Sequence, residues 1–279
     1  MTRRWLCLAL FVIPLSPLGA QGIAYEGGVS LSSGHYIFAT RTTSWTISTG
    51  LSVTAGRLVL RAAVPAYIQN TSLVTGSGAG MMPSGGSTSS GTVSDGGRGG
   101  MMGERGSGNH HLPVPSAALT GYRAAAGDPV VQAGWRTPAG AHNTVAVSAA
   151  GKIPATDTTA YGTGQWDVGG TLSATRHVGV RSLVAVDVSY WHLGDTPTLD
   201  FRDPVVATLS ASAVFASTWG ASVLVTGGTS ALRGYEAPLS LGAAVTHLGK
   251  GRLWGLSAAV GLTETVPDFT IGASWRLEL

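Results

Sequence analysis

Apolar and polar residues alternate along most of this chain. In residues 267–279 apolar side chains occupy every second position, and small, hydroxyl-bearing or charged side chains lie between them. Successive side chains of a β-strand point to opposite faces, so this segment predicts a strand with one apolar and one polar face. A strand of this kind at the end of the sequence, where a soluble domain often frays, favours a sheet that closes on itself.

About twelve such segments follow one another, each of roughly the length that a tilted membrane-spanning strand requires. The first is expected at residues 24–34. Short connections near residues 55–56, 138–140, 177–180, 217–220 and 249–251 alternate with longer ones at 35–42, 70–121, 154–164, 194–202 and 229–236. Short turns on one rim and long loops on the other are typical of outer-membrane barrels, whose short turns face the periplasm. The chain is therefore predicted to be all-β, a transmembrane antiparallel up-and-down β-barrel.

Aromatic residues occur at both ends of the predicted strands. Those at short-turn ends are Trp135, Trp219 and Trp254, and those at long-loop ends are Trp45, Trp166 and Tyr190. Two such groups predict the aromatic belts that lie at the two interfaces of a membrane. The alternative, ordinary core tryptophans of a soluble β-sandwich, fits less well, because an outward aromatic residue at both ends of many strands is hard to bury in one core.

The first twenty residues have the organisation of a secretory signal peptide. Arg3 and Arg4 precede an apolar run at residues 5–15, and small residues follow up to Ala20, after which cleavage is expected. No later segment has the apolar length of a spanning helix. The single cysteine, Cys7, lies inside the signal, so the predicted barrel of residues 21–279 has no disulfide and no thiolate metal site.

Composition agrees with a membrane barrel. Charged residues make up 11% of the chain, well below the ~25% of soluble domains, and Gly is abundant with 41 residues. Without Arg3 and Arg4 the 17 basic residues fall to 15 against 14 acidic ones, which gives no support to a nucleic-acid partner. The expected partners are outer-membrane lipid, the barrel-assembly machinery and a small-molecule permeant. No cofactor is expected.

Residues 71–113 lose the alternation and are rich in Gly and Ser. Such a segment buries too little apolar surface to fold alone, so a flexible loop at the extracellular rim is expected. It contains three pairs of soft donors: Met81 and Met82, Met101 and Met102, and His110 and His111. Thioether and imidazole groups bind copper(I) or zinc, which makes these pairs candidates for a weak metal site. The preferred interpretation is that they are scattered in the loop and bind no metal.

Three motifs resemble those of a known family. Gly127-Asp128-Pro129 opens one strand, Lys152-Ile153-Pro154 closes another, and Gly162-Thr163-Gly164 leads to Asp167. They resemble motifs of the outer-membrane β-barrel family of the meta-pathway of phenol degradation, and a looser similarity extends over residues 28–279. Ala155-Thr156 replace the family's Thr-Gly, and Leu279 replaces its terminal aromatic residue. The resemblance implies a transporter-like barrel for passive transport of small, often aromatic or hydrophobic compounds. The family-motif positions are Gly127, Asp128, Lys152, Pro154, Gly162, Gly164 and Asp167.

Seven charged residues fall on the predicted inner face: Arg61, Asp128, Lys152, Asp167, Asp187, Arg276 and Glu278. A charge facing lipid would cost about 2–4 kcal/mol at mid-membrane, which favours inward placement. Lys152 ends one strand and Asp167 begins the next, so they are expected to face each other across a hairpin. Opposed inner charges either select permeants through a transverse field or form salt bridges that hold the wall. The second interpretation is preferred for Lys152 and Asp167, and Arg61 and Asp187 are the better pore-lining candidates.

A barrel of about eight strands has an interior filled by side chains, and one of about sixteen strands encloses an open channel, so a barrel of twelve strands is intermediate. Small inner-face residues leave room for a narrow passage, so the leading hypothesis is an outer-membrane channel or facilitator for passive uptake or export of small, aromatic or hydrophobic molecules. A structural or surface-interaction barrel without transport is the alternative. A hydrolase with its site at the rim is the least favoured, because no serine lies in a nucleophile-elbow motif near a rim histidine. No enzyme activity is expected.

Overall fold

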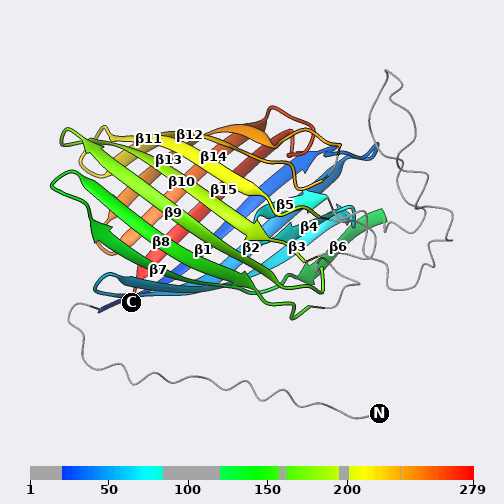
Figure 1. Ribbon diagram of the computed structural model, residues 1–279, viewed down its shortest axis with the longest axis horizontal. Coiled ribbons are helices and arrows are strands. Elements are labelled where there is room, and N and C mark those ends of the chain that lie inside the picture. Colours follow the sequence, from blue (N-terminus) through cyan, green and yellow to red (C-terminus); the bar gives the residue numbers. More distant parts are fainter. Residues whose placement is uncertain (1–20, 84–119, 157–160, 162, 195–200, 233) are drawn as a thin grey trace, which may run out of the picture.

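The computed structural model describes residues 21–83, 120–156, 161, 163–194, 201–232 and 234–279, whose main feature is one closed antiparallel sheet (Figure 1). Its strands are β1 (Gln21–Gly34), β2 (Thr42–Ala55), β3 (Leu58–Thr71), β6 (Thr120–Ala126), β7 (Val130–Pro138), β8 (Asn143–Lys152), β9 (Asp167–Val178), β10 (Ser182–His192), β11 (Val205–Val214), β12 (Trp219–Gly228), β13 (Leu239–Gly249), β14 (Arg252–Gly261) and β15 (Phe269–Glu278). β6 and β7 both pair with β3 and are two halves of one wall strand. The wall therefore has twelve strand positions, which confirms the predicted barrel. Among the described residues, no helix is long and apolar enough to cross a membrane.

The barrel closes between its first and last strands. β15 pairs with β1 from Ala24 and Glu278 to Ser33 and Phe269, and the Leu279 N–H donates to the Ile23 carbonyl over 2.8 Å. β1 also pairs with β2 along its whole length, so neither strand presents a free edge. The first strand begins at Gln21, three residues before the predicted start, and the predicted pairing of the two terminal segments is confirmed.

Alternation along the strands gives the wall an apolar outer face. Leu51, Val147, Leu172 and Leu256 all point away from the lumen and are more than half exposed. Large apolar side chains cover this face on all sides, far beyond the patch that a soluble monomer exposes. The intervening inner positions carry mostly Ser, Thr, Gly and Ala. This is the arrangement of a wall whose outer face contacts lipid.

The predicted aromatic residues lie exposed on the outer face: Trp45, Trp135, Trp166, Tyr190, Trp219 and Trp254. Near the short turns, Trp254 lies beside Trp275 with ring centroids 6.3 Å apart, and Trp219 packs on His247 at 4.8 Å. None of these six side chains is in a core, so the sandwich alternative is wrong. The reason is that a single closed sheet has no second sheet to cover its outer face.

One end of the barrel has tight turns and the other has long connections, as predicted (Figure 1). Two residues join β2 to β3 and β13 to β14, whereas seven join β1 to β2. The start of β1 and the end of β15 both lie at the short-turn end. Residues 1–20, which carry the predicted signal, lie outside the described part of the chain.

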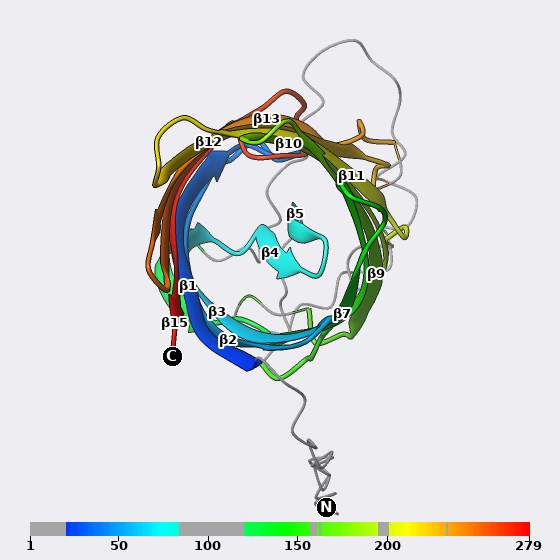
Figure 2. The ribbon, with the colours of Figure 1, turned by 90° about the vertical axis from the view of Figure 1, so that its left-hand side faces the viewer.

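The segment after β3 differs from the prediction. Residues 71–113 were expected to form a flexible loop at the rim, but β4 (Val74–Ser77) and β5 (Gly80–Pro83) form a hairpin that lies inside the barrel (Figure 2). Leu73 and Val74 are fully buried there. The lumen supplies the apolar partners that this segment lacks in its own sequence, so its first part is ordered. Residues 84–119 lie outside the described part.

Candidate functional site in the barrel lumen

The β4–β5 hairpin lies directly on aromatic side chains of the inner wall. A Cβ atom at Gly76 would overlap the phenol of Tyr67, and one at Gly78 would overlap the indole of Trp191. Tyr67 and Trp191 come from β3 and β10, and both are buried under the hairpin. Glycine at these two positions allows the hairpin backbone to approach the rings.

An apolar cluster fills the long-loop end of the lumen around this hairpin. The β1–β2 connection contributes Tyr36, Ile37 and Phe38, each at most 2% exposed. The other members are Leu73, Val74, Met82, Trp191, Leu193, Phe201 and Leu232. The apolar core of the described molecule thus lies inside the barrel, because the large apolar side chains of the wall point outward. Burial raises the pKa of the Tyr36 phenol to about 12, with a smaller contribution from the charge of Asp268.

A buried charged cluster lies beneath the hairpin. The Lys152 Nζ is 3.2 Å from Asp167 Oδ2 and 3.4 Å from Asp128 Oδ2, and it donates a hydrogen bond to Thr163 Oγ1. All three charged side chains are at most 2% exposed. Lys152 and Asp167 are register partners across β8 and β9, which confirms that they face each other. One amino group thus lies between two carboxyl groups in the interior of the barrel.

Asp167 connects the wall to the hairpin. Its Oδ2 accepts a hydrogen bond from the Gly78 N–H over 3.0 Å, and its Oδ1 accepts one from the Gly194 N–H over 3.1 Å. Tyr161 makes a second connection: its carbonyl accepts from Thr75 Oγ1, and its hydroxyl donates to the Gln69 carbonyl over 3.1 Å. The bond from the Gly78 N–H satisfies a backbone group of the hairpin, and the bond from the Thr75 hydroxyl ties its first strand to Tyr161, so both hold the hairpin in the lumen.

Asp128 holds the connection that follows β8. Its Oδ1 accepts hydrogen bonds from the Ala155 N–H at 3.1 Å, the Thr156 N–H at 3.0 Å and the Thr156 hydroxyl at 2.7 Å. Ala155 and Thr156 therefore form the turn after Pro154 although they depart from the Thr-Gly of the resembled family. Gly127, before Asp128, lies against Tyr67, and its N–H donates to the Pro65 carbonyl at 2.8 Å. The motif residues thus meet around the hairpin, and Gly164 adopts a φ of +67° nearby. Gly162 lies outside the described residues.

Below the hairpin the inner wall carries charges that are open to the lumen. The Arg276 Nη1 is 2.8 Å from Glu26 Oε1, and the Arg61 Nε is 3.5 Å from Glu26 Oε2. Ser52 also donates to Glu26 Oε1. Asp187 lies on the inner face of β10, where it accepts a hydrogen bond from Ser173. Arg61 and Asp187 thus lie on the inner face of two distant wall strands, β3 and β10.

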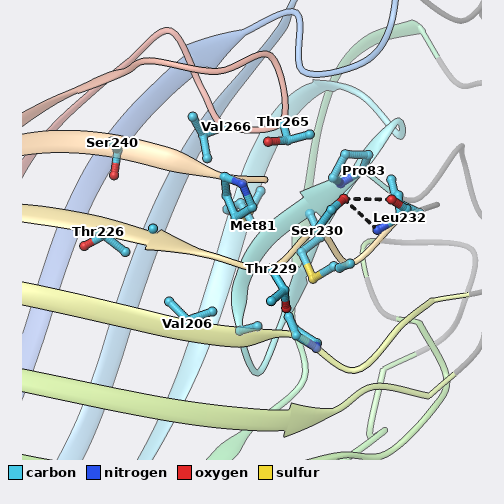
Figure 3. A pocket seen from close by; sticks show the side chains of 16 residues that line it. Met81, Pro83, Val206, Thr226, Thr229, Ser230, Leu232, Ser240, Thr265 and Val266 are labelled. Carbon is cyan, nitrogen blue, oxygen red and sulfur yellow. Dashed lines mark hydrogen bonds between the residues drawn. The ribbon is translucent and has the colours of Figure 1, made fainter. Parts of the chain in front are cut away.

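An apolar cavity of about 140 Å³ separates the hairpin from the wall formed by β11, β12 and β13 (Figure 3). Met81, Met82 and Pro83 line it from the hairpin side, and Val206 and Thr226 line it from the wall. The β12–β13 connection adds Ser230 and Leu232 to the lining. The Leu232 N–H donates a hydrogen bond to the Ser230 hydroxyl over 3.2 Å. A space of this size has room for a small ring, and most of its lining surface is apolar.

The candidate metal residues divide between the core and the undescribed segment. Met82 is buried in the apolar cluster and Met81 packs against it, so hydrophobic contacts account for this pair. Met101, Met102, His110 and His111 lie outside the described residues. Within the described part, no group of three or more His, Cys, Asp and Glu side chains could hold a metal ion.

A polar group on the outer face involves one of the rim histidines. The Asp203 carboxylate accepts hydrogen bonds from the Tyr190 hydroxyl at 2.7 Å and from the Leu193 N–H at 3.2 Å, and the His192 ring lies within 3.0 Å of it. The Tyr190 hydrogen bond, followed by that of His192, lowers the pKa of the Asp203 carboxyl. The hydroxyl that completes this group belongs to a tyrosine, which differs from the serine nucleophile of a hydrolase.

The sequence did not single out the aromatic residues that hold the hairpin. Tyr36, Phe38, Tyr67, Tyr161 and Trp191 are all buried in the lumen. Tyr67 and Trp191 fall on inner-face positions of their strands, where most residues are small. Large aromatic side chains on an inner face of otherwise small residues could therefore have indicated that another segment of the chain packs against them inside the barrel.

Comparison with known proteins shows the fold and leaves the family open. Neither a protein-family model nor a curated protein matches the chain. The crystal structure of the COG4313 outer membrane channel from Pseudomonas putida F1 is similar, with a TM-score of 0.62 and 11% identity over 94% of this chain and 97% of that one. The CymD monoaromatic hydrocarbon channel is similar with a TM-score of 0.50 and 10% identity over 93% of this chain and 88% of that one. At these identities the likeness establishes the barrel fold.

Proposed function

We propose that this protein is an outer-membrane channel or facilitator for the passive passage of small molecules, among them small aromatic and other apolar compounds. The apolar cavity between the β4–β5 hairpin and the wall carries the proposal, because it is a ring-sized site inside a closed barrel. The two similar barrels support it, since one is an outer membrane channel and the other a monoaromatic hydrocarbon channel.

The surface of the barrel supports a location in the bacterial outer membrane. Its outer face is apolar, and aromatic side chains lie exposed near both rims. The signal-like pattern of residues 1–20 supports export. In this location the outer-membrane lipid and the barrel-assembly machinery are the partners that the protein requires.

In this proposal the lumen has two functional parts. Arg61, Asp187 and Arg276 line the route on the short-turn side, where they meet a permeant. Asp128, Lys152 and Asp167 are covered, so they anchor the hairpin and its neighbouring loop instead of lining the route. A permeant that leaves the cavity passes beside the hairpin, and a shift of the hairpin widens this passage.

Liposome swelling with a matched pair of solutes tests the proposal. Methyl and phenyl β-glucoside share one sugar and differ in the apolar group, so a channel with a ring site admits the phenyl compound at least as fast although it is larger. Thr226→Phe fills the cavity from the inner face of β12 and is expected to slow the phenyl compound several-fold. Ser222→Phe, on the same face of β12 but outside the cavity, is the matched control.

A barrel that is structural or binds a surface without transport is the alternative. The hairpin and apolar cluster that occupy the long-loop end of the lumen favour it. Folded protein that admits neither glucoside, nor a small sugar such as arabinose, would exclude the channel and leave this alternative.

A further inference from the structure

A second cavity lies at the short-turn end of the lumen, opposite the apolar one. Its volume is about 240 Å³, and its lining includes Thr54, Arg57, Arg136 and Thr144. Thr54, Arg136 and Thr144 lie on the inner face of β2, β7 and β8, by the alternation that turns Trp135 outward. These three lining positions face the lumen, whereas Arg57, in the β2–β3 turn at the rim, also donates to Thr137, which shares the outer face of Trp135.

The two arginines of this cavity are neighbours across strands. The Arg136 N–H donates to the Arg57 carbonyl over 2.9 Å, so their side chains start from adjacent positions. Like charges at such positions repel each other unless an anion lies between them. Among the described residues neither arginine has a carboxylate within ion-pair distance, and Arg57 donates only a long 3.4 Å hydrogen bond to Thr137.

The positive charge continues further into the lumen. Arg61 and Arg276 share one carboxylate, that of Glu26, and the Arg61 side chain remains 48% exposed. Arg57, Arg61, Arg136 and Arg276 are here called the basic mouth, and Glu26 is the one described acid that forms ion pairs with any of them. The other inner-face acid at this end, Glu278, lies beside Gly251 in the β13–β14 turn and, within the described part of the chain, forms no ion pair with these arginines.

We propose that the basic mouth binds the anionic group of the permeant, so that the molecules carried are small organic anions with a short apolar body. This rests on the proposed function and names its substrate class. A guanidinium group binds a carboxylate through two parallel hydrogen bonds, and the hydroxyls of Thr54 and Thr144 are further donors. A molecule this small meets the basic mouth and the apolar cavity one after the other, because the two cavities lie at opposite ends of the lumen. An electropositive lumen also concentrates anions from solution.

Selectivity of the full-length folded barrel in planar bilayers is the first test. Under a KCl gradient, chloride is expected to permeate roughly tenfold more readily than potassium. In liposomes, benzoate is expected to enter faster than its neutral analogue benzamide. The double variant R57Q/R136Q lowers both preferences at least threefold. R176Q, which removes the same charge from the outer face of β9, leaves them unchanged because the barrel wall lies between this side chain and the lumen. A conducting barrel without anion preference, or one whose preference survives R57Q/R136Q, overturns the inference.

Chemical protection tests the site without transport. Phenylglyoxal modifies accessible arginines, and mass spectrometry reads each position separately. Millimolar benzoate is expected to slow modification of Arg136 about tenfold and to leave Arg176 unaffected. Protection in a barrel that admits no solute would refute the proposed channel and retain the anion site. Protection by inorganic phosphate but not by benzoate, or no protection of Arg136 at all, would overturn the organic-anion class.

Discussion

At the scale of single residues, burial decides how the lumen is held together. Lys152, Asp128 and Asp167 are removed from water, which is costly for each charge unless its partners replace the lost hydration. Asp167 and Asp128 obtain further hydrogen bonds from backbone N–H groups of Gly78, Gly194 and the turn after Pro154. The cluster therefore depends on every member, and removal of its one cation leaves two facing carboxylates.

We predict that Lys152→Met lowers the free energy of unfolding by about 3–5 kcal/mol, because both buried acids lose their counter-charge. Urea unfolding of the barrel in lipid vesicles, followed by tryptophan fluorescence, measures this. Lys250→Met, in the exposed β13–β14 turn, is the control and is expected to change stability by less than about 0.5 kcal/mol. Equal effects of the two substitutions on the free energy of unfolding would mean that the buried cluster stabilises the barrel no more than an exposed lysine does.

Tyr36 gives a pH-dependent prediction. Its folded pKa of about 12 lies above the unfolded value of 10.0, so the stability that its burial contributes is complete below pH 10 and is lost as the pH rises towards 12. The loss is on the order of 3 kcal/mol for a difference of about two pKa units. Tyr36→Phe removes it, and the stability difference between wild type and variant measured at pH 8 and pH 11.5 isolates this residue from other tyrosines. A difference that does not change with pH contradicts the burial of the phenol.

At the scale of elements, the β4–β5 hairpin is too short to be stable alone. Two strands of four residues form only a marginal structure in water. Contacts from three distant parts of the wall stabilise it: Tyr67 on β3, Trp191 on β10 and Asp167 on β9. Because the loss of one of these contacts weakens the others, we expect the hairpin to leave its position as a unit when one contact is removed.

Gly78→Val is predicted to displace the hairpin, because the new side chain would occupy the position of the Trp191 ring. Single-channel conductance in planar bilayers is expected to rise at least twofold as the lumen widens. Gly22→Val provides the control, since a Cβ at that position meets no atom within 4 Å. Unchanged conductance in a folded Gly78→Val barrel would show that the hairpin does not limit the passage.

At the scale of the whole molecule, closure between β15 and β1 makes the barrel. Trp275 lies on the outer face of β15, and its ring covers Gly27 of β1 so closely that a Cβ atom added to Gly27 would lie 2.6 Å from the ring. The ring also neighbours that of Trp254 on β14. It therefore contacts both strands that flank the last one. The first and last strands of the sheet meet at this junction, which closes the barrel.

Trp275→Glu is predicted to prevent barrel assembly. The substitution removes the packing across the closing strands and places a charge on the lipid-facing side, which costs up to about 2–4 kcal/mol depending on depth. The measurement is the fraction of protein that folds after dilution into vesicles. In SDS gels the folded barrel migrates differently from the unfolded chain until the sample is heated. Ser274→Asp, one residue away on the inner face, is expected to assemble. Assembly of the Trp275→Glu variant would mean that the outer face does not contact lipid.

The alternation of apolar and polar residues by itself determined the barrel. Lipid outside and a polar lumen inside constrain every second residue locally, so each strand could be recognised without knowledge of its partners. The pairing of Lys152 with Asp167 was predictable for the same reason, because the two close one hairpin.

Only the tertiary structure decided what fills the lumen. Gly78 meets Asp167 across 89 residues, and Thr75 meets Tyr161 across 86, and no period in the sequence relates such positions. The hairpin is a Gly-rich segment that is ordered only because the lumen offers it buried partners, and its own composition resembles that of a flexible loop. The same holds for Tyr36, Ile37 and Phe38, whose burial depends on closure of the whole wall around them.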